Sequence, residues 1–377
     1  MLPTSLYIHI PWCIRKCPYC DFNSHKSPDV LPEVRYINAL IADLKQDLSY
    51  LPTREISSIF IGGGTPSLLS AEAYSQLLHQ LKQLLPFAAD LEITLEANPG
   101  TFEQQRFSDY RQLGINRLSL GIQSFNPRHL KKLGRIHDEK QAHLAIEAAR
   151  KAGFDNINLD IMHSLPEQTV AEGLDDLSQA LAHQPEHLSW YQLTLEPNTV
   201  FYKQQPVLPG EDDNEELEIN GLALLAKHGF ERYEISAYCK NKKFARHNLN
   251  YWLFGDYYGI GAGAHGKITT DSKIIYRTRK QRQPGDYLHP EKVMLVACLP
   301  VSIEDVIFEF MLNTTRLQEP IPYTLFSQRT GLACDLLQGK LKEAKDKGLV
   351  SMNSSAWQVT DLGRRFTNNL QALFLPD

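Results

Sequence analysis

The chain has 377 residues, of which 42% are hydrophobic and 22% charged, and its formal net charge is −5. This composition is typical of a soluble globular protein and excludes a strongly basic nucleic-acid-binding protein. No apolar stretch reaches the length of about 18 residues that a membrane-spanning helix needs. Since the first residues do not resemble a signal peptide, we expect a cytoplasmic protein, with peripheral membrane association left open.

Six apolar, β-branched runs alternate with amphipathic helical patterns in the first half of the chain. We expect strands at 5–10, 57–62, 92–97, 117–122, 156–161 and 188–193. We expect helices between them at 33–51, 71–85, 139–153 and 170–184. This alternation predicts a parallel α/β sheet with right-handed crossovers. Six units are too few for a closed eight-unit barrel, so an open partial barrel and a doubly wound sheet both fit.

The second half of the chain changes character. Residues 201–215 predict a surface loop, 216–228 a helix, 246–266 an aromatic, glycine-rich pocket segment, and 285–290 a linker. Helical patterns at 302–313, 323–330 and 334–347 then precede two short strands and a last helix, which indicates a winged-helix-like α+β module. We therefore predict a core at 1–240, a pocket segment and linker at 241–290, and a C-terminal domain at 291–377. Nine basic and ten acidic residues in that domain argue against binding to nucleic acid.

Three of the six cysteines fall within eight residues, at Cys13, Cys17 and Cys20. Such clustering favours metal ligation over isolated buried thiols. A zinc site needs four ligands, which His9 or His25 would complete. Alternatively, three thiolates on one short loop suit a 4Fe–4S cluster with one iron left without a protein thiolate.

Polar or glycine-rich residues follow each predicted strand at its carboxyl end. These ends meet at one rim of a parallel sheet, where such folds bind ligands. Gly62–Thr65 allows close approach to the backbone but does not match a phosphate-binding loop, so an amino-acid-like zwitterion fits better. Glu96 and Asp160 each end an apolar strand, where a carboxylate is costly unless it is paired or faces a ligand.

Five motifs then carry a resemblance to a known family. YIHIPWCIRKCPYC, GGGTPS, LEANPG, GIQSF and INLDIMHSLP, in this order, resemble the radical-SAM family of oxygen-independent coproporphyrinogen III oxidases and their heme-chaperone relatives. The resemblance implies a partial (β/α)6 barrel, with a 4Fe–4S cluster on the three clustered cysteines and S-adenosylmethionine on the fourth iron. The positions that match S-adenosylmethionine contacts are Tyr7, Tyr19, Gly63, Gly64, Thr65, Glu96, Gln123, Arg135 and Asp160.

Two departures favour the heme-chaperone branch over the oxidase branch. The oxidases carry a further cysteine where this chain has Phe22, and they have an N-terminal extension before the first strand. Residues 247–252 match the HNxxYW motif of the chaperone branch, which implies heme as cargo, with His247 and Tyr251 as candidate heme residues. Alternatively, His247 hydrogen-bonds only within the fold.

This resemblance also sets expectations for activity and partners. It implies recipient proteins such as respiratory hemoproteins, and it assigns no catalytic residue. Oxidative decarboxylation of coproporphyrinogen III remains the alternative function. Ser164 stands where the family pattern leads us to expect glycine, and a basic run at 277–282 is expected to form a solvated face, a partner contact or a propionate contact.

Overall fold

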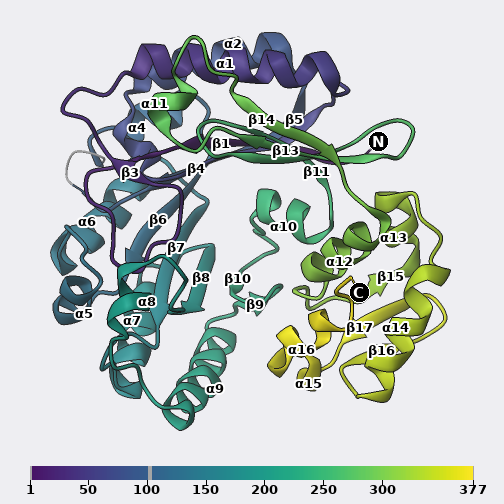
Figure 1. Ribbon diagram of the computed structural model, residues 1–377. Helices are drawn as coiled ribbons and strands as arrows, with labels where there is room; N and C mark the ends of the chain where they lie inside the picture. The colour runs from purple at the N-terminus through teal and green to yellow at the C-terminus, as the bar shows by residue number, and fades with distance from the viewer. Residues whose placement is uncertain (1, 101–103, 377) are drawn as a thin grey trace.

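The computed structural model describes residues 2–100 and 104–376. Within these residues, twelve strands form one open sheet in the order β14-β13-β12-β11-β1-β4-β5-β6-β7-β8-β10-β9. The six predicted strands form its central run, in which each is parallel to the next. They are β1 (Thr4–Ile10), β4 (Ile56–Gly63), β5 (Phe87–Ala97), β6 (Arg117–Gln123), β7 (Ile157–His163) and β8 (His187–Gln192). The partial (β/α)6 barrel is therefore confirmed, and the sheet curves around its inner face (Figure 1).

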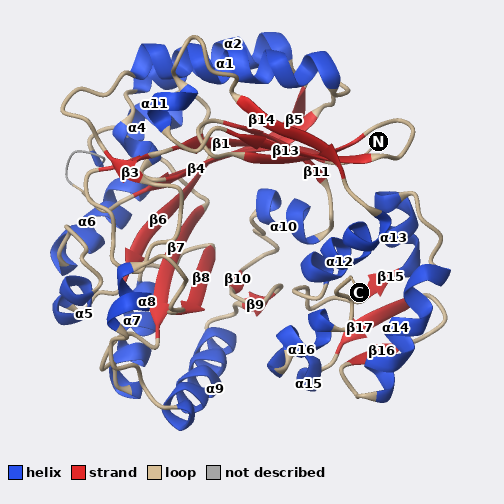
Figure 2. Cartoon of the chain, in the orientation of Figure 1, coloured by secondary structure: helices blue, strands red, loops and turns tan. Residues whose placement is uncertain are grey.

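Helices cover the outer face of this sheet (Figure 2). They are α1 (Glu33–Tyr50), α2 (Ala71–Leu84), α4 (Phe107–Gln112), α5 (Pro127–Lys132), α6 (Glu139–Lys151) and α7 (Val170–Ala182). Capping boxes at Asp138 and Thr169 satisfy free backbone N–H groups at the starts of α6 and α7. Local sequence thus sets where these crossover helices begin, close to the predicted positions.

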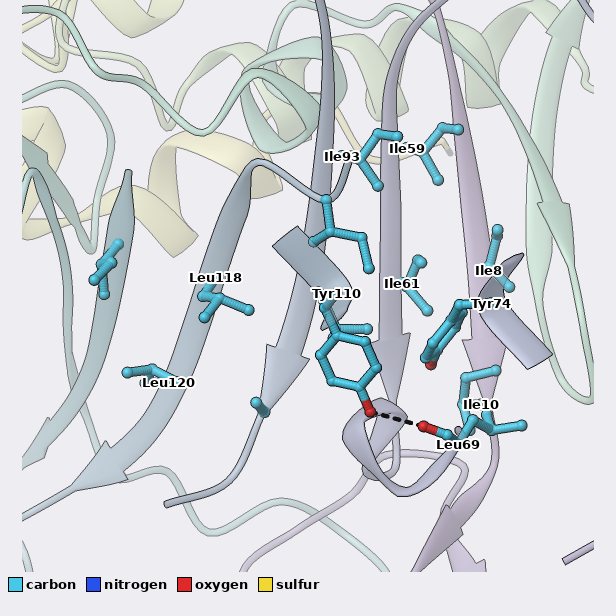
Figure 3. Packing of buried hydrophobic residues seen from close by; sticks show 14 of the residues in the cluster. Ile8, Ile10, Ile59, Ile61, Leu69, Tyr74, Ile93, Tyr110, Leu118 and Leu120 are labelled. Atoms are coloured by element: carbon cyan, nitrogen blue, oxygen red, sulfur yellow. Dashed lines mark hydrogen bonds between the residues drawn. The ribbon is translucent and has the colours of Figure 1, made fainter. Parts of the chain in front are cut away.

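Apolar side chains fill the layer between the sheet and the helices. Figure 3 shows Ile8 and Ile61 from neighbouring strands packed against Tyr74 and Tyr110 from the covering helices. The Tyr110 hydroxyl donates to the Leu69 carbonyl at 2.7 Å, so the rings are anchored as well as buried. Because side chains alternate along a strand, the residues next to these isoleucines project from the inner face of the barrel.

The predicted loop at 201–215 is wrong in part. Within it the structure has α8 (Val200–Gln204) and the first turns of α9 (Glu211–Lys227). The Thr199 side chain accepts from the Tyr202 backbone N–H and caps α8. The acidic residues that indicated a loop, Glu211 to Asp213, occupy the first turn of α9, where the helix dipole favours negative charge.

Residues 231–300 add strands to both edges of the sheet. On one side lie β9 (Glu231–Arg232) and β10 (Ala237–Cys239), and on the other β11 (Asp256–Ile260), β12 (His265–Thr269), β13 (Ile275–Lys280) and β14 (Leu295–Pro300). Strand β11 is parallel to β1, whereas β12 to β14 are antiparallel. The predicted linker at 285–290 is corrected: it begins in α11 (Pro284–Tyr287), whose Tyr287 is fully buried and donates to Asp43 at 2.7 Å.

The basic run at 277–282 is not a solvated face throughout. Lys280 is about 1% exposed, and its Nζ lies 2.5 Å from carboxylate oxygens of both Asp43 and Asp47 on α1. Arg277 pairs with Glu309 at 2.6 Å. These two residues therefore join parts of the fold, and neither is free to meet a propionate.

The C-terminal residues form a second, smaller unit, whose apolar core also includes Phe254 and Ile275 from the preceding segment. Its elements are α12 (Ile303–Thr314), β15 (Ile321–Pro322), α13 (Tyr323–Thr330), α14 (Asp335–Asp346), β16 (Val350–Met352), β17 (Ala356–Val359), α15 (Asp361–Arg365) and α16 (Thr367–Ala372). Three short strands pair in the order β15-β17-β16, and Trp357 of β17 belongs to one buried apolar cluster with Phe310 and Phe326. This is the expected winged-helix-like arrangement. In the part of the chain that is described, no helix is long and apolar enough to cross a membrane.

Candidate cofactor site

A cavity of about 450 Å³ opens at the carboxyl edge of the parallel strands. Segments that follow or end β1, β4, β5, β6, β7 and β8 all contribute to its wall, as the sequence pattern predicted. The lining includes these residues singled out from the sequence: Cys13, Cys17, Cys20, Tyr19, Gly63, Gly64, Thr65, Glu96, Gln123, Arg135 and Asp160. Residues more than 140 positions apart in the chain thus face one space.

The three clustered cysteines lie on one wall of this cavity. The short strand β2 (Trp12–Cys13) pairs with β3 (His25–Lys26) and closes the loop that carries them. Burial raises the pKa of Cys13 and of Cys20, so these thiols hold their protons until a metal displaces them. Among the described residues, no three His, Cys, Asp or Glu side chains converge on a single ion position.

Hydrogen-bond donors point at two of the sulfur atoms. The Thr65 hydroxyl lies 3.4 Å from the Cys13 sulfur, and an Arg135 guanidinium nitrogen lies 3.8 Å from the Cys17 sulfur. Donors around thiolate ligands stabilise their negative charge and tune a bound metal. These donors would stabilise the charge of the thiolates once a bound metal has displaced their protons.

The glycine loop after β4 is held against the cysteine loop. The backbone N–H groups of Gly64 and Thr65 donate to the Ile10 and Trp12 carbonyls, each at 2.7 Å. Gly63 has a φ of 116°, and a Cβ at Gly64 would lie 2.5 Å from the Trp12 carbonyl oxygen. Glycine is therefore required here by the close approach of the chain, whether or not a ligand also uses the exposed backbone.

Two carboxylates share the floor of the cavity. Glu96 accepts from the Gly63 N–H at 3.0 Å, and Asp160 accepts from Ser119 and Asn158, each at 2.9 Å. Burial, reinforced by the negative charge of Asp160, raises the pKa of Glu96 to about 8. Burial also raises the pKa of Asp160. Such a pair favours a ligand that brings positive charge or hydroxyl donors.

Arg135 reaches the cavity from the segment after β6. One of its nitrogens donates to the Asn98 side chain at 2.6 Å and to the Gly121 carbonyl at 2.7 Å. Its buried Nε has no hydrogen-bond partner in the described structure. A buried donor without a partner is costly, so this atom is available to an acceptor on a ligand.

Gln123 is positioned by a residue that sequence reasoning missed. Gln123 ends β6 with a φ of 69°, and its Oε1 accepts from the Tyr191 hydroxyl at 2.9 Å. Asn98, which the sequence placed at the carboxyl end of the third strand, lines the cavity, and so do Tyr191 and Ser119, which we did not predict. Tyr191 sits in β8 (HLSWYQ), a strand of mixed polar and apolar residues, where the pattern alone does not distinguish a cavity residue from a core residue.

Tyr7 does not line the cavity, unlike the other matched positions. Its hydroxyl shares a 2.9 Å hydrogen bond with His9 Nδ1, and its ring lies against Phe60 with centroids 6.3 Å apart. Burial and then the nearby charge of Glu96 raise its pKa. Tyr7 therefore lies near Glu96 but outside the lining of the cavity.

The candidate heme residues lie outside the cavity too. Both belong to α10 (Arg246–Trp252), and the His247 side chain is 1% exposed. Its Nδ1 lies 3.2 Å from the Ser58 hydroxyl and its Nε2 lies 2.8 Å from the Tyr251 hydroxyl. Burial lowers the pKa of His247 to about 3, so the ring is neutral. In this conformation both ring nitrogens are used within the fold.

These residues fit the cofactors that the resemblance implies. The three cysteines that line the cavity would supply thiolates for three irons of a cluster, and the cavity beside them has room for a small ligand. The orphaned Arg135 Nε and the two carboxylates offer a donor and acceptors to an amino-acid-like nucleoside.

Comparison with known proteins defines the class first. Residues 7–179 match the radical SAM superfamily, and residues 301–366 match the HemN C-terminal domain. The fold is similar to the crystal structure of the radical SAM coproporphyrinogen III oxidase HemN from Escherichia coli, with a TM-score of 0.82 at 24% identity. The match covers 99% of this chain and 90% of that one. This is a radical SAM protein, a class whose cofactors are a 4Fe–4S cluster and S-adenosylmethionine.

Full-length relatives then give the family. The chain is 48% identical to the heme chaperone HemW of Escherichia coli, across 100% of this chain and 99% of the relative. It is 46% identical to HemW of Haemophilus influenzae and 34% identical to HemW of Bacillus subtilis, again over nearly the full length of both chains. The chain belongs to the HemW family of heme chaperones.

Proposed function

We propose that this protein binds heme and transfers it to recipient proteins in the cytoplasm, such as respiratory hemoproteins. The observation that carries the proposal is the full-length similarity to heme chaperones at up to 48% identity. The oxidase HemN shares the fold at 24% identity, which supports the architecture and leaves the activity open.

The side chains around the cavity have distinct roles in this proposal. Cys13, Cys17 and Cys20 hold the cluster, and Thr65 and Arg135 donate toward its sulfur ligands. When bound, the cluster and S-adenosylmethionine supply one-electron chemistry. Arg135 offers its free Nε to a ligand carboxylate, and Gly63, Gly64, Tyr19 and Gln123 shape the remaining wall.

Phe22 supports chaperone function over oxidase function. Its side chain lines the cavity entrance and is 57% exposed, at the position where the oxidase pattern has a further cysteine. A phenylalanine there offers an apolar surface and neither a thiol proton nor a metal ligand. A reaction that needs a fourth sulfur at this position therefore lacks it in this chain.

We assign His247 and Tyr251 to heme binding, which requires a change in the conformation of α10. Heme iron is commonly bound by histidine, but the His247 Nε2 is occupied by the Tyr251 hydroxyl. Ligation therefore requires that this hydrogen bond open and that α10 expose the ring. Aromatic neighbours such as Tyr257, with its centroid 4.5 Å from that of Tyr251, would then cover a porphyrin face.

Heme transfer and oxidase turnover are separated by one paired assay. Anaerobic, cluster-reconstituted protein is loaded with heme and mixed with an apo-hemoprotein of the respiratory chain, and the recipient's absorbance spectrum is followed. In parallel, the same protein receives coproporphyrinogen III, reductant and S-adenosylmethionine. We expect heme to appear in the recipient and no protoporphyrinogen IX to form. Sustained turnover without heme transfer would replace the proposal with the oxidase function.

A further inference from the structure

A chain of hydrogen bonds leads from the cavity floor to the start of α10. The Asn158 Nδ2 donates to Asp160 at 2.9 Å, and the Asn158 Oδ1 lies 2.6 Å from His187 Nδ1. His187 Nε2 lies 2.8 Å from the Tyr233 hydroxyl, which in turn accepts from the Ala245 N–H at 3.3 Å. Ala245 is the N-cap residue of α10, so five residues connect two distant parts of the molecule.

Every link in this chain has a single direction. The Asn158 amide oxygen only accepts, so His187 Nδ1 carries the proton and Nε2 accepts from Tyr233. The Asp160 carboxylate accepts from the Asn158 Nδ2 and so sets the amide orientation, and the Ser189 hydroxyl also donates to the amide oxygen at 3.1 Å. Burial lowers the pKa of His187 well below its usual value and keeps the ring neutral. An oriented, buried chain of this kind has one arrangement rather than several.

The hairpin formed by β9 and β10, which carries Tyr233, makes a second connection, to the C-terminal unit. Ser236 lines the cavity and donates from its hydroxyl to Glu234 Oε1 at 2.9 Å. The other oxygen of Glu234 accepts from Arg316 at 2.9 Å, and the Arg316 guanidinium lies 4.2 Å from the Trp252 ring centroid in α10. The Gln318 N–H also donates to the Tyr233 carbonyl at 3.1 Å.

We propose that residues 231–239 couple occupancy of the cavity to the seating of α10, with His187, Asn158 and Tyr233 as positioning residues. This rests on the proposed function only in taking S-adenosylmethionine as the cavity ligand. A ligand that engages Asp160 fixes that carboxylate, and the oriented chain transmits the constraint to Ala245. Helix α10 is thus held more firmly when the cavity is filled.

Coupling between two sites is reciprocal, so it is measurable from either end. Coupling energies between sites usually correspond to about a 5-fold to 150-fold change in binding or opening. We expect S-adenosylmethionine to slow hydrogen–deuterium exchange of the α10 amides by at least about 5-fold. Loosening α10 is expected to weaken S-adenosylmethionine binding by the same factor.

The experiment uses cluster-reconstituted, anaerobic full-length protein and three variants. Peptide-level hydrogen–deuterium exchange over 245–253 is measured with and without S-adenosylmethionine, whose affinity is measured separately by calorimetry. Tyr233→Phe removes one hydroxyl of the chain and keeps the ring. Tyr238→Phe is the matched control, because Tyr238 lies in the same hairpin, is buried and takes no part in the chain. Ser236→Ala removes the hydroxyl hydrogen bond to Glu234 and keeps the backbone one, so it weakens the second connection and leaves the first intact.

We expect the native protein and Tyr238→Phe to show ligand-dependent protection of α10, Tyr233→Phe to lose it, and Ser236→Ala to lose part of it. If native protein binds S-adenosylmethionine and α10 exchange does not change, the coupling is wrong while the proposed site stands. If no binding occurs, both are wrong. Equal protection in native protein and Tyr233→Phe would also overturn the proposal. Should Tyr233→Phe fail to fold, the native and Ser236→Ala measurements decide.

Discussion

At the scale of single residues, the cavity shows which side chains a sequence identifies and which it does not. Glu96 and Asp160 are recognisable in the sequence because burying a carboxylate in an apolar strand is costly unless it is paired or faces a ligand. Tyr191 and Ser119 are not, because a tyrosine or serine in a strand is ordinary in sequence. His247 lies in a recognisable motif, and its partner Tyr251 is only 4 positions away in the sequence. Its other partner, Ser58, is 189 positions away, so only the fold reveals that contact.

The raised pKa of Glu96 predicts a pH dependence of stability. With a pKa of about 8 in the fold against an ordinary 4.5, Glu96 keeps a proton that the unfolded chain releases between these values. Its contribution to the free energy of unfolding is therefore complete below about pH 4.5 and is lost as the pH rises through 8. Urea unfolding from pH 5 to 9 is expected to show this decline in native protein and a flatter profile in Glu96→Gln.

The matched control for this measurement is Glu72→Gln, since Glu72 is exposed in the first turn of α2. It is expected to follow the native pH profile. If Glu96→Gln keeps the native slope as well, the proton is not held by Glu96 in the folded protein.

At the scale of elements, periodicity predicted the parallel strands well, since buried strands carry continuous apolar runs that turns interrupt. The start of α9 was predicted wrongly as a loop, because a run of acidic residues is common both in solvated loops and in the first turn of a helix. The strands β12 to β14 were missed for another reason. Lys267 and Lys280 lie in them, fully buried and paired with aspartates that come from elsewhere in the chain. Those partners are invisible to local pattern analysis.

The buried ion triad around Lys280 predicts a large loss of stability on substitution. Lys280→Met leaves Asp43 and Asp47 together without a cation in a site that is about 1% exposed or less. Breaking a buried pair in this way costs about 3–5 kcal/mol. The free energy of unfolding in urea should fall by that amount, whereas Lys45→Met on the exposed face of α1 should change it by no more than about 0.5 kcal/mol. A small loss for Lys280→Met would show that the triad contributes little to holding β13 against α1.

The hydrogen bond between His247 and Tyr251 in α10 leads us to expect different effects on heme binding when each residue is substituted. Tyr251→Phe removes the hydroxyl that occupies His247 Nε2 and keeps the aromatic ring that would contact the porphyrin, so heme should bind at least as tightly as to native protein. His247→Ala removes the proposed ligand, so heme affinity should fall about 10-fold or more and the absorption band of the complex should shift. Heme titration followed by absorbance compares the two. Unchanged affinity and spectrum in His247→Ala would leave this histidine with a structural role alone.

At the scale of the whole molecule, the barrel and the C-terminal unit are joined by specific contacts rather than by chain connection alone. Arg277 pairs with Glu309, Arg316 with Glu234, and the Arg329 Nε donates to the Leu253 carbonyl at 3.0 Å. The sequence identified the C-terminal unit by its change of character. The boundaries at 240 and 290 stay predictions, and the sheet itself continues to Pro300. Contacts of this kind depend on residues distant in sequence, which explains why composition did not reveal them.

The central claim is that the cysteine loop and the cavity beside it hold a 4Fe–4S cluster next to S-adenosylmethionine. Electron paramagnetic resonance of the reduced, anaerobically reconstituted protein, recorded before and after S-adenosylmethionine is added, tests it most directly. We predict a cluster signal that shifts on addition, is lost in Cys17→Ser and is kept in Cys298→Ser, whose thiol lies in β14 away from the cavity. A native protein without a cluster signal, or with one that S-adenosylmethionine does not alter, would contradict the account.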